Sequence, residues 1–369
     1  MVKHVMSWSR EILKLPFGTL YIGSLPLGCS LCHKGQKLVL FITGLCNRRC
    51  WYCPISDERR GKDIMFANEV QVRDLDEIIK QAMLMDARGT GITGGEPLLV
   101  FSRLIKIIKL LKSKLGSEHH IHLYTNGELL SRNHAILLKE CGLDELRIHI
   151  TSERSWKGVE IAINAGLLVG IEIPVIPNQL DYYKRLILRA ESLGVKFINL
   201  NELEVSESNY MAMKLRGYDV KDDVPYAVKG SERTAVELLK WAKENTKRIT
   251  IHYCPAKVKD AIQLKSRLKR IANKVAKPYE IVDEDGLLVK CVISSEGNML
   301  PLLRLISEKV GKSKIHIVSG RYAEVSIAHL DEVIKLIKRS TDIKRKIKLY
   351  VVREHPITHL ILEKIPLDI

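Results

Sequence analysis

Strand-like and helix-like segments alternate from residue 37 to residue 203. The pattern predicts six strands separated by five helices, and such alternation is typical of βαβ units that form a parallel sheet. Six units are too few for a closed eight-stranded barrel, so they favour an open, partial one. The predicted strands are Lys37–Thr43, Gly89–Thr93, Ile121–Thr125, Leu146–Thr151, Ile171–Ile176 and Phe197–Leu203.

Polar residues and glycines follow the carboxyl ends of these predicted strands. In a parallel sheet those ends lie at one edge, where ligands bind. We therefore expect the functional site at that edge. The residues placed there are Cys46, Gly94-Gly95-Glu96, Thr125-Asn126-Gly127, Thr151-Ser152, Pro177-Asn178 and Glu202.

Beyond residue 210 the alternation loosens, which predicts three regions. Residues 1–36 form an N-terminal extension that contains Cys29 and Cys32. Residues 37–210 form the partial (β/α)6 barrel, and residues 211–369 form a basic α+β region. The expected fold class is therefore α/β.

The positive charge of the chain is concentrated near its C-terminus. There are 59 Lys and Arg against 43 Asp and Glu, for a formal net charge of +16. Lys257–Lys277 and Lys338–Lys348 carry most of that excess, and the first has apolar residues at helical spacing. Such segments are either solvated surfaces or phosphate-binding surfaces for RNA, including tRNA. Neither contains an aromatic residue for base stacking.

The chain contains no apolar run of the ~18–20 residues that a membrane span needs. Charged residues near the N-terminus, Lys3, Arg10 and Glu11, interrupt the position of a secretory signal. We expect a cytoplasmic protein with no membrane partner.

Three of the eight cysteines, Cys46, Cys50 and Cys53, follow the first predicted strand with the spacing C-x3-C-x2-C. A chain of this length is not a small disulfide scaffold, so clustered cysteines favour metal binding or redox chemistry. Three thiolates on one loop can hold three irons of a cubane cluster and leave the fourth open. A structural zinc site would need a fourth ligand. Unliganded or redox-active thiols are the remaining alternative.

The cysteine loop and two later motifs resemble the radical S-adenosylmethionine superfamily. Its cluster motif has an aromatic residue before the last cysteine, as Tyr52 is here. Gly94-Gly95-Glu96-Pro97 is similar to the GGEP motif of the superfamily, whose glycines let the backbone approach the methionine amino group. Tyr124-Thr125-Asn126-Gly127 is similar to its TNG segment. The resemblance covers about residues 37–205. The lead-in to Cys29 and Cys32, with Lys37–Leu45, also resembles uncharacterised archaeal proteins related to pyruvate formate-lyase activating enzymes.

The resemblance implies a [4Fe–4S] cluster held by Cys46, Cys50 and Cys53, with S-adenosylmethionine as the second cofactor. It implies reductive cleavage of that cofactor to a 5′-deoxyadenosyl radical, which abstracts hydrogen from a substrate. The electron donor would be a ferredoxin or flavodoxin. The cofactor-binding residues that it implies are Tyr52, Gly94, Gly95, Glu96, Thr125 and Asn126, with Thr151, Ser152 and Glu172 as ribose contacts or ordinary polar strand residues.

Cys29 and Cys32 supply half of a second metal site. Cys254 or Cys291 could complete it across space. Several families in the superfamily carry an auxiliary iron–sulfur cluster, which favours iron–sulfur over zinc here. The alternative is a free or redox-active pair of thiols.

Four functions follow from these features. The first is radical modification of RNA or tRNA, bound through Lys257–Lys277 and Lys338–Lys348. The second is radical modification of a protein or peptide, as by a glycyl-radical activase. The third is biosynthesis of a small molecule. The fourth is a non-enzymatic iron–sulfur or zinc protein that binds RNA, which the intact cysteine and glycine motifs disfavour.

Overall fold

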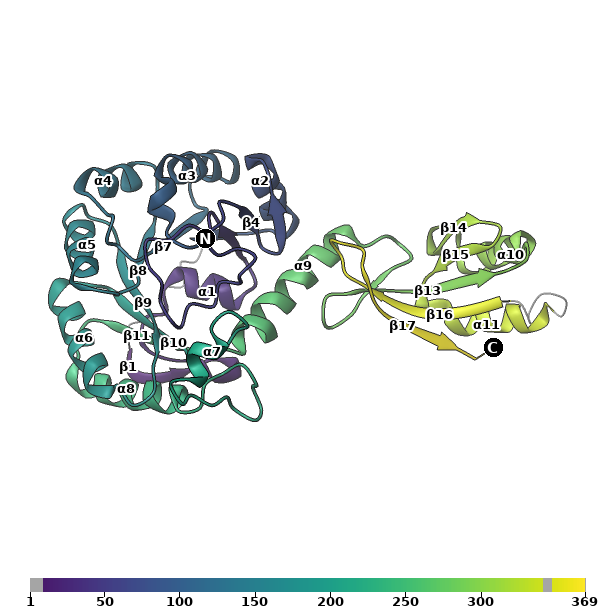
Figure 1. Ribbon diagram of the computed structural model, residues 1–369. Coiled ribbons are helices and arrows are strands. Elements are labelled where there is room, and N and C mark those ends of the chain that lie inside the picture. Colours follow the sequence, from purple (N-terminus) through teal and green to yellow (C-terminus); the bar gives the residue numbers. More distant parts are fainter. Residues whose placement is uncertain (1–8, 341–346, 369) are drawn as a thin grey trace. The chain divides into compact units, whose positions relative to one another are not determined.

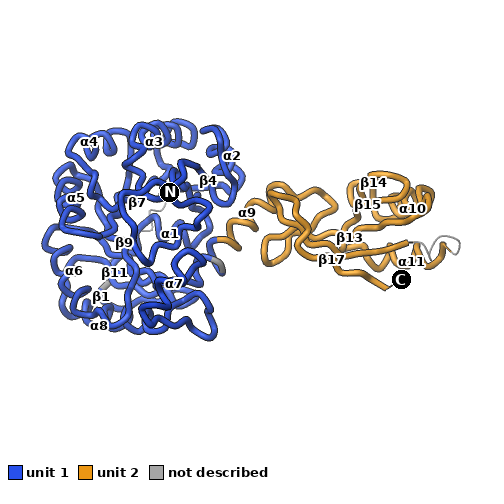
Figure 2. Tube along the Cα trace, in the orientation of Figure 1, with its two compact units in different colours: residues 1–263 blue, residues 264–369 orange. Residues whose placement is uncertain are grey.

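The computed structural model describes residues 9–340 and 347–368. The chain divides into two compact units, Met1–Gln263 and Leu264–Ile369 (Figure 2). The sequence predicted a boundary near residue 210, whereas the structure keeps residues 211–263 in the first unit. The reason is that this stretch contains β11 (Thr250–Cys254), which joins the sheet of the first unit.

The first unit is built on an 11-stranded sheet in the order β1-β2-β11-β10-β9-β8-β7-β6-β3-β4-β5. Its central strands pair in parallel, from β3 through β6 to β11. The expected α/β class and partial barrel are confirmed, with β11 as a further parallel strand. The other central strands are β3 (Lys37–Phe41), β6 (Gly89–Thr93), β7 (His120–Thr125), β8 (Glu145–Ile148), β9 (Val169–Val175) and β10 (Phe197–Glu202).

Antiparallel strands extend the sheet at both ends. The residues that the sequence placed in an N-terminal extension belong to the first unit, because β2 pairs with β11. The flanking strands are β1 (Ser9–Lys14) and β2 (Leu20–Gly23) on one side and β4 (Met65–Ala67) and β5 (Val70–Val72) on the other.

Helices cover the outside of the curved sheet, while α1 (Leu27–His33) lies on its inside (Figure 1). A Cβ on Gly28 of α1 would approach His122 of β7 and Arg147 of β8 to 2.7 Å. The Cys29 Sγ lies 3.4 Å from Asn199 Nδ2 on β10. One short helix therefore contacts side chains from both halves of the sheet. The other helices of this unit are α2 (Leu75–Leu84), α3 (Phe101–Leu115), α4 (Arg132–Glu140), α5 (Glu153–Asn164), α6 (Leu180–Leu193), α7 (Tyr210–Lys214) and α8 (Ser231–Asn245).

The second unit contains a 6-stranded antiparallel sheet in the order β14-β15-β13-β16-β17, with β12 paired to β13. Its central elements follow one another as β-α-β-β-α-β, and their strand order is that of a split β-α-β arrangement. The elements are α9 (Lys265–Val275), β12 (Ile281–Val282), β13 (Leu288–Ser295), α10 (Leu300–Val310), β14 (Ile315–Ser319), β15 (Tyr322–Val325), α11 (Leu330–Arg339), β16 (Ile347–Glu354) and β17 (Ile361–Leu367).

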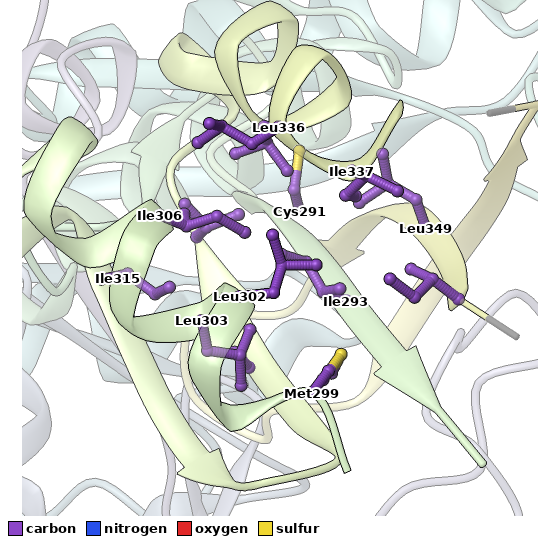
Figure 3. Packing of buried hydrophobic residues seen from close by; sticks show 14 of the residues in the cluster. Cys291, Ile293, Met299, Leu302, Leu303, Ile306, Ile315, Leu336, Ile337 and Leu349 are labelled. Carbon is purple, nitrogen blue, oxygen red and sulfur yellow. The ribbon is translucent and has the colours of Figure 1, made fainter. Parts of the chain in front are cut away.

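One face of this second sheet packs against α10 and α11 and forms an apolar core (Figure 3). Cys291 lies in this core with 0% exposure, among side chains that include Ile306 and Ile337. Burial raises the pKa of its thiol to about 12. Packing in the second unit thus accounts for the burial of Cys291 without a metal.

Within the described part of the chain, no helix has both the length and the apolar character that crossing a membrane requires.

Replacing Leu303 with alanine tests the core of the second unit. Leu303 is 0% exposed, whereas Leu305 on the same helix is 41% exposed. The Leu303→Ala change leaves a cavity and should lower the free energy of unfolding of this unit by about 2–5 kcal/mol. Hydrogen exchange at the amides of β13 and β15 should therefore accelerate in Leu303→Ala and stay near wild type in Leu305→Ala. Equal exchange in the two variants would contradict this packing.

Candidate active site

The cysteine loop begins where β3 ends and is closed at its base by backbone hydrogen bonds. Gly44 N donates to Lys62 O at 2.8 Å, and Gly61 N donates to Gly44 O at 2.8 Å. Within the loop, Cys53 N donates to Cys50 O at 3.1 Å. The loop therefore presents Cys46, Cys50 and Cys53 from one compact turn, and all three line one cavity of about 790 Å³.

The donor set of this loop suits a cluster. Cys46 is exposed, and Cys50 and Cys53 are half-buried. Burial raises the pKa of the Cys46 and Cys50 thiols, so a cation beside them is needed to hold them as thiolates. In the described part of the chain, the Sγ atoms of these three cysteines lie too far from one another to bind a single ion together. That spacing fits an iron–sulfur cluster better than a single zinc ion.

Gly94 and Gly95 bring the end of β6 against the start of the cysteine loop. A Cβ on Gly94, whose φ is +151°, would lie 2.4 Å from Thr43 O, and a Cβ on Gly95 would lie 2.1 Å from Leu45 O. Gly95 N donates to Thr43 O at 2.7 Å, and Glu96 N donates to Leu45 O at 2.7 Å. The glycines are thus required by the close backbone contact itself.

Glu96 is fully buried and joins the ends of β6 and β7. Its carboxylate accepts hydrogen bonds from Thr125 Oγ1 at 2.6 Å, Asn126 N at 2.8 Å and Leu98 N at 3.0 Å. Burial raises the pKa of this carboxyl group, against the effect of these donors. Asn126 Nδ2 in turn donates to Asn47 Oδ1 of the cysteine loop at 2.7 Å. The polar groups of Glu96 and Thr125 are therefore bonded to each other and to their neighbours. These two residues position the site and offer no free polar group to the cavity.

Glu128 connects the cysteine loop to the end of β8. Its carboxylate accepts hydrogen bonds from Arg48, from Thr151 Oγ1 at 3.1 Å and from Ser152 Oγ. Although burial acts to raise it, the hydrogen bonds from Ser152, Thr151 and Arg48 hold the pKa of Glu128 below its ordinary value. Ser152 also caps α5 by accepting from Arg154 N at 3.2 Å. Both hydroxyl residues proposed from the sequence thus share Glu128 as a partner.

Tyr52 is held in place by His149. The Tyr52 hydroxyl lies 2.8 Å from His149 Nε2, and His149 Nδ1 lies 2.8 Å from the backbone oxygen of Glu172. A backbone oxygen only accepts, so Nδ1 carries the proton and Nε2 accepts from Tyr52. Burial lowers the pKa of His149, which keeps the ring neutral.

A network of paired charges forms the inner wall of the cavity. The Glu172 carboxylate accepts from Asn199 Nδ2 at 2.6 Å, from Asn201 Nδ2 at 2.9 Å and from Arg147 Nη1 at 3.0 Å. Lys259 and Glu204, which also line the cavity, form an ion pair at 2.6 Å. The cavity therefore offers a ligand both donors and acceptors that are already oriented by their partners.

The segment that follows β10 folds over the cysteine loop. Asn209 Nδ2 donates to Tyr52 O at 3.1 Å, and the Trp51 ring stacks on Tyr218 with centroids 5.8 Å apart. The guanidinium carbon of Arg216 lies over the Trp51 ring, 4.6 Å from its centroid. This covering segment had no distinct sequence pattern, and it supplies part of the cavity wall through Ser208 and Ala212.

Most of the residues proposed from the sequence meet at this cavity. Those lining it are Cys46, Cys50, Tyr52, Cys53, Gly94, Gly95, Thr125, Asn126, Thr151 and Glu172. Glu96 and Ser152 lie behind the wall. Sequence reasoning missed Glu128, Arg147 and His149. Glu128 directly follows the Thr125-Asn126-Gly127 motif, and His149 lies two residues before Thr151, just after β8 ends. These positions were the available signals.

Cys29, Cys32 and Cys254 lie in the first unit and are not among the residues that line the cavity, although the Cys29 Sγ lies 3.4 Å from Nη2 of the lining residue Arg147. Burial raises the pKa of Cys29 to about 11, although Arg147 acts to lower it. Burial also raises the pKa of Cys254, with Cys32 and Cys29 as the next contributors. These three sulfurs therefore share one buried region, while Cys291 belongs to the core of the second unit. The auxiliary metal site expected from the sequence stays a prediction.

Some basic residues of the first segment are paired or buried, whereas the described basic residues of the second, Lys338, Arg339 and Lys348, are exposed. The predicted single helix is divided into a π-helix, Lys259–Leu264, and α9. In α9, Lys265 pairs with Asp285 at 3.1 Å, and Arg267 is buried. In Lys338–Lys348, residues 341–346 lie outside the described residues. RNA binding through these segments stays a prediction.

Comparison with known proteins identifies relatives of this chain. Residues 40–152 match the Radical SAM superfamily. A Methanocaldococcus jannaschii protein named "Putative glycyl-radical enzyme activating enzyme" is 42% identical over 297 residues, which cover 77% of this chain and 78% of that protein. The GTP 3′,8-cyclase of Alkaliphilus oremlandii is 35% identical over 120 residues, covering 32% of this chain and 36% of the cyclase. The crystal structure of Streptococcus suis SuiB bound to S-adenosylmethionine aligns with a TM-score of 0.45 at 12% identity, covering 61% of this chain and 52% of SuiB.

The lowered pKa of Glu128 predicts a pH-dependent contribution to stability. A carboxyl group with a depressed folded-state pKa stabilises the fold above its ordinary pKa, near 4.5, and loses that contribution as pH falls through the folded-state value. Glu128→Gln should therefore unfold at lower urea concentration than wild type at pH 7, with the difference shrinking below pH 4.5. Glu153→Gln, which breaks an exposed ion pair with Arg189, is the control and should change little. A difference between Glu128→Gln and wild type that does not change with pH would contradict the assignment.

Proposed function

The chain belongs to the radical S-adenosylmethionine superfamily, and from this premise we propose that it modifies a protein or peptide substrate by abstracting a hydrogen atom. Membership implies an enzyme that uses S-adenosylmethionine and a [4Fe–4S] cluster. Bound here, these cofactors supply a one-electron cleavage of the sulfonium that yields a hydrogen-abstracting radical. The observation that carries the proposal is one cavity lined by the three loop cysteines, Gly94 and Gly95.

In this proposal Cys46, Cys50 and Cys53 hold the cluster, and no fourth protein ligand is required. Of the described side chains that line the same cavity, the three cysteines are the only thiols. Arg60, which donates to Cys53 O and Ile55 O at 3.1 Å, stabilises the loop around them. One iron is thereby left for the amino and carboxylate groups of S-adenosylmethionine.

The backbone and hydroxyl groups around the loop would hold S-adenosylmethionine. The N–H groups of Gly95 and Glu96 already donate to Thr43 and Leu45, so the segment offers a ligand its carbonyl oxygens. Carbonyl oxygens accept from an ammonium group, which suits the methionine amino group. Thr151, which lines the cavity, would place its hydroxyl beside the ribose hydroxyls, while Glu128 and Ser152 would hold that part of the wall from behind.

Two observations support a polypeptide as the substrate. The relative with 42% identity is named as an activating enzyme for a glycyl-radical enzyme, whose substrate is a protein. The cavity lining combines apolar surface from Trp51 and Ala212 with the oriented polar groups of Asn201, Glu204 and Lys259. A backbone segment, with alternating donors and acceptors and small side chains, fits such a surface. A cytoplasmic location and a ferredoxin or flavodoxin electron donor complete the proposal.

Replacing one loop cysteine should abolish cofactor cleavage. Anaerobically reconstituted and reduced protein should form 5′-deoxyadenosine from S-adenosylmethionine. The Cys50→Ala variant should bind less iron and form at least about 100-fold less product. A 100-fold loss corresponds to an activation free energy raised by about 2.7 kcal/mol, and losing a cluster ligand should raise it by at least that much. Cys141→Ala, outside the cavity lining, should behave as wild type. Equal product formation by Cys50→Ala would contradict the ligand assignment.

The substrate class can be tested with fractionated extract of the source organism. Extract added to the reduced enzyme should raise the rate of 5′-deoxyadenosine formation above its substrate-free rate. Prior digestion with a protease, inactivated before mixing, should remove that stimulation, while ribonuclease digestion should not. Loss of stimulation with ribonuclease would contradict the proposal in favour of RNA. Stimulation by the small-molecule filtrate would contradict it in favour of a biosynthetic enzyme.

A further inference from the structure

Two histidines and a glutamate meet inside the barrel, at the amino end of its strands. His120 and His122 lie on one face of β7, and Glu145 of β8 is paired in register with His122. One ligand atom from each of these residues lies within 4.8 Å of the other two. Among the described residues, no other three His, Cys, Asp or Glu side chains bring their ligand atoms so close together. His120 is five residues from Thr125, or about 17 Å along the strand, so this cluster is separate from the cysteine loop.

The histidines of this cluster have polar atoms that lack partners. Within the described part of the chain, His120 Nε2 and both ring nitrogens of His122 are buried without a hydrogen bond. The adjacent His119, by contrast, has its Nε2 2.8 Å from Thr90 Oγ1. A neutral imidazole has one donor and one acceptor, and burying both without partners is unfavourable. His122 is 0% exposed, so bulk solvent does not satisfy them.

Two glycines leave the space that the His122 ring occupies. A Cβ on Gly91 of β6 would lie 2.6 Å from His122 Nε2, and a Cβ on Gly28 of α1 would lie 2.7 Å from His122 Nδ1. The ring is therefore confined between the sheet and α1. Confinement of an unpartnered imidazole beside a second one indicates a built site rather than loose packing.

The Glu145 carboxylate is oriented toward this cluster. Its Oε1 accepts a hydrogen bond from Arg147 Nε, and its Oε2 lies 3.7 Å from His120 Nε2. That separation is too long for a hydrogen bond. It is close to the ~3.4 Å between two ligands of a tetrahedral zinc ion. Arg147 then acts as the outer partner that fixes a ligating carboxylate.

We propose that His120, His122 and Glu145 bind one divalent transition-metal ion, with zinc as the ion that two imidazoles and a carboxylate suit best. The ion connects β7 to β8 underneath α1 and takes one buried nitrogen from each imidazole. Three protein ligands leave one tetrahedral position for a water molecule. The site is independent of the proposed function, since it lies at the other end of the strands from the cysteine loop.

The experiment measures metal content and ligand type in the full chain with its iron cofactor. Purified wild type should contain one zinc per chain by mass spectrometry in addition to iron. His120→Gln and His122→Gln should lose the zinc and keep the iron. His119→Gln, whose imidazole bonds to Thr90, is the matched control and should retain both. A variant with Cys46, Cys50 and Cys53 all replaced by serine should keep its zinc, because the loop does not hold it.

X-ray absorption at the zinc edge of that triple variant identifies the ligands directly. The site predicts nitrogen and oxygen neighbours at about 2.0–2.2 Å and no sulfur. Sulfur neighbours near 2.3 Å would overturn the proposal in favour of Cys29, Cys32 and Cys254. Wild-type protein without stoichiometric zinc after exposure to excess zinc and gel filtration would also overturn it, as would His122→Gln that retains the metal.

Discussion

The buried carboxylate of Glu96 is the interaction on which the candidate active site depends. Glu96 follows β6 and accepts hydrogen bonds from Leu98 in the next turn and from Thr125 and Asn126 at the end of β7, and so fixes the relative position of two strand ends. Asn126, held in this way, contacts Asn47 in the cysteine loop. A buried carboxylate without those donors would be strongly unfavourable, so the strand ends and the loop are locked together by one group. Gly94 and Gly95 permit the arrangement because nothing larger fits against Thr43 and Leu45.

The inside of the barrel is polar, and its charges are arranged in pairs. Arg147, which is almost fully buried, bonds to Glu145 on one side and to Glu172 on the other. It therefore links the histidine cluster at the amino end of the strands to the cavity at their carboxyl end. Because a buried charge is tolerated only with its partners in place, the packing of α1 against Arg147 and the position of Glu172 are coupled. Substrate and cofactor would bind to a wall whose charged groups are already oriented by their partners.

The sequence predicted the features that depend on local pattern. Strand and helix alternation identified the parallel strands, and motif spacing identified Cys46, Cys50, Cys53, Gly94 and Gly95 as neighbours. Contacts between distant segments were not accessible in the same way. The β-branched and aromatic residues at 249–253 favour a strand, but nothing in their pattern shows that β11 pairs with both β10 and β2.

Side-chain partners were equally hidden from the sequence. From the sequence, Thr151 and Ser152 were either ribose contacts or ordinary polar strand residues, and their bonds to Glu128 depend on how the loops meet in space. Cys291 was a candidate to complete the site of Cys29 and Cys32 across space, but its apolar surroundings come from α10 and α11, which lie later in the chain. Arg267 is buried by tertiary packing, which cannot be inferred from the number of basic residues in its segment.

The central claim is that three loop cysteines hold an iron–sulfur cluster with one iron open to S-adenosylmethionine. Electron paramagnetic resonance of the reduced, oxygen-protected protein, recorded before and after addition of S-adenosylmethionine, tests it most directly. Direct coordination predicts the signal of a reduced [4Fe–4S] cluster whose g values shift when the cofactor is added. A cluster signal that S-adenosylmethionine leaves unchanged, or no cluster signal in reconstituted protein, would contradict the account.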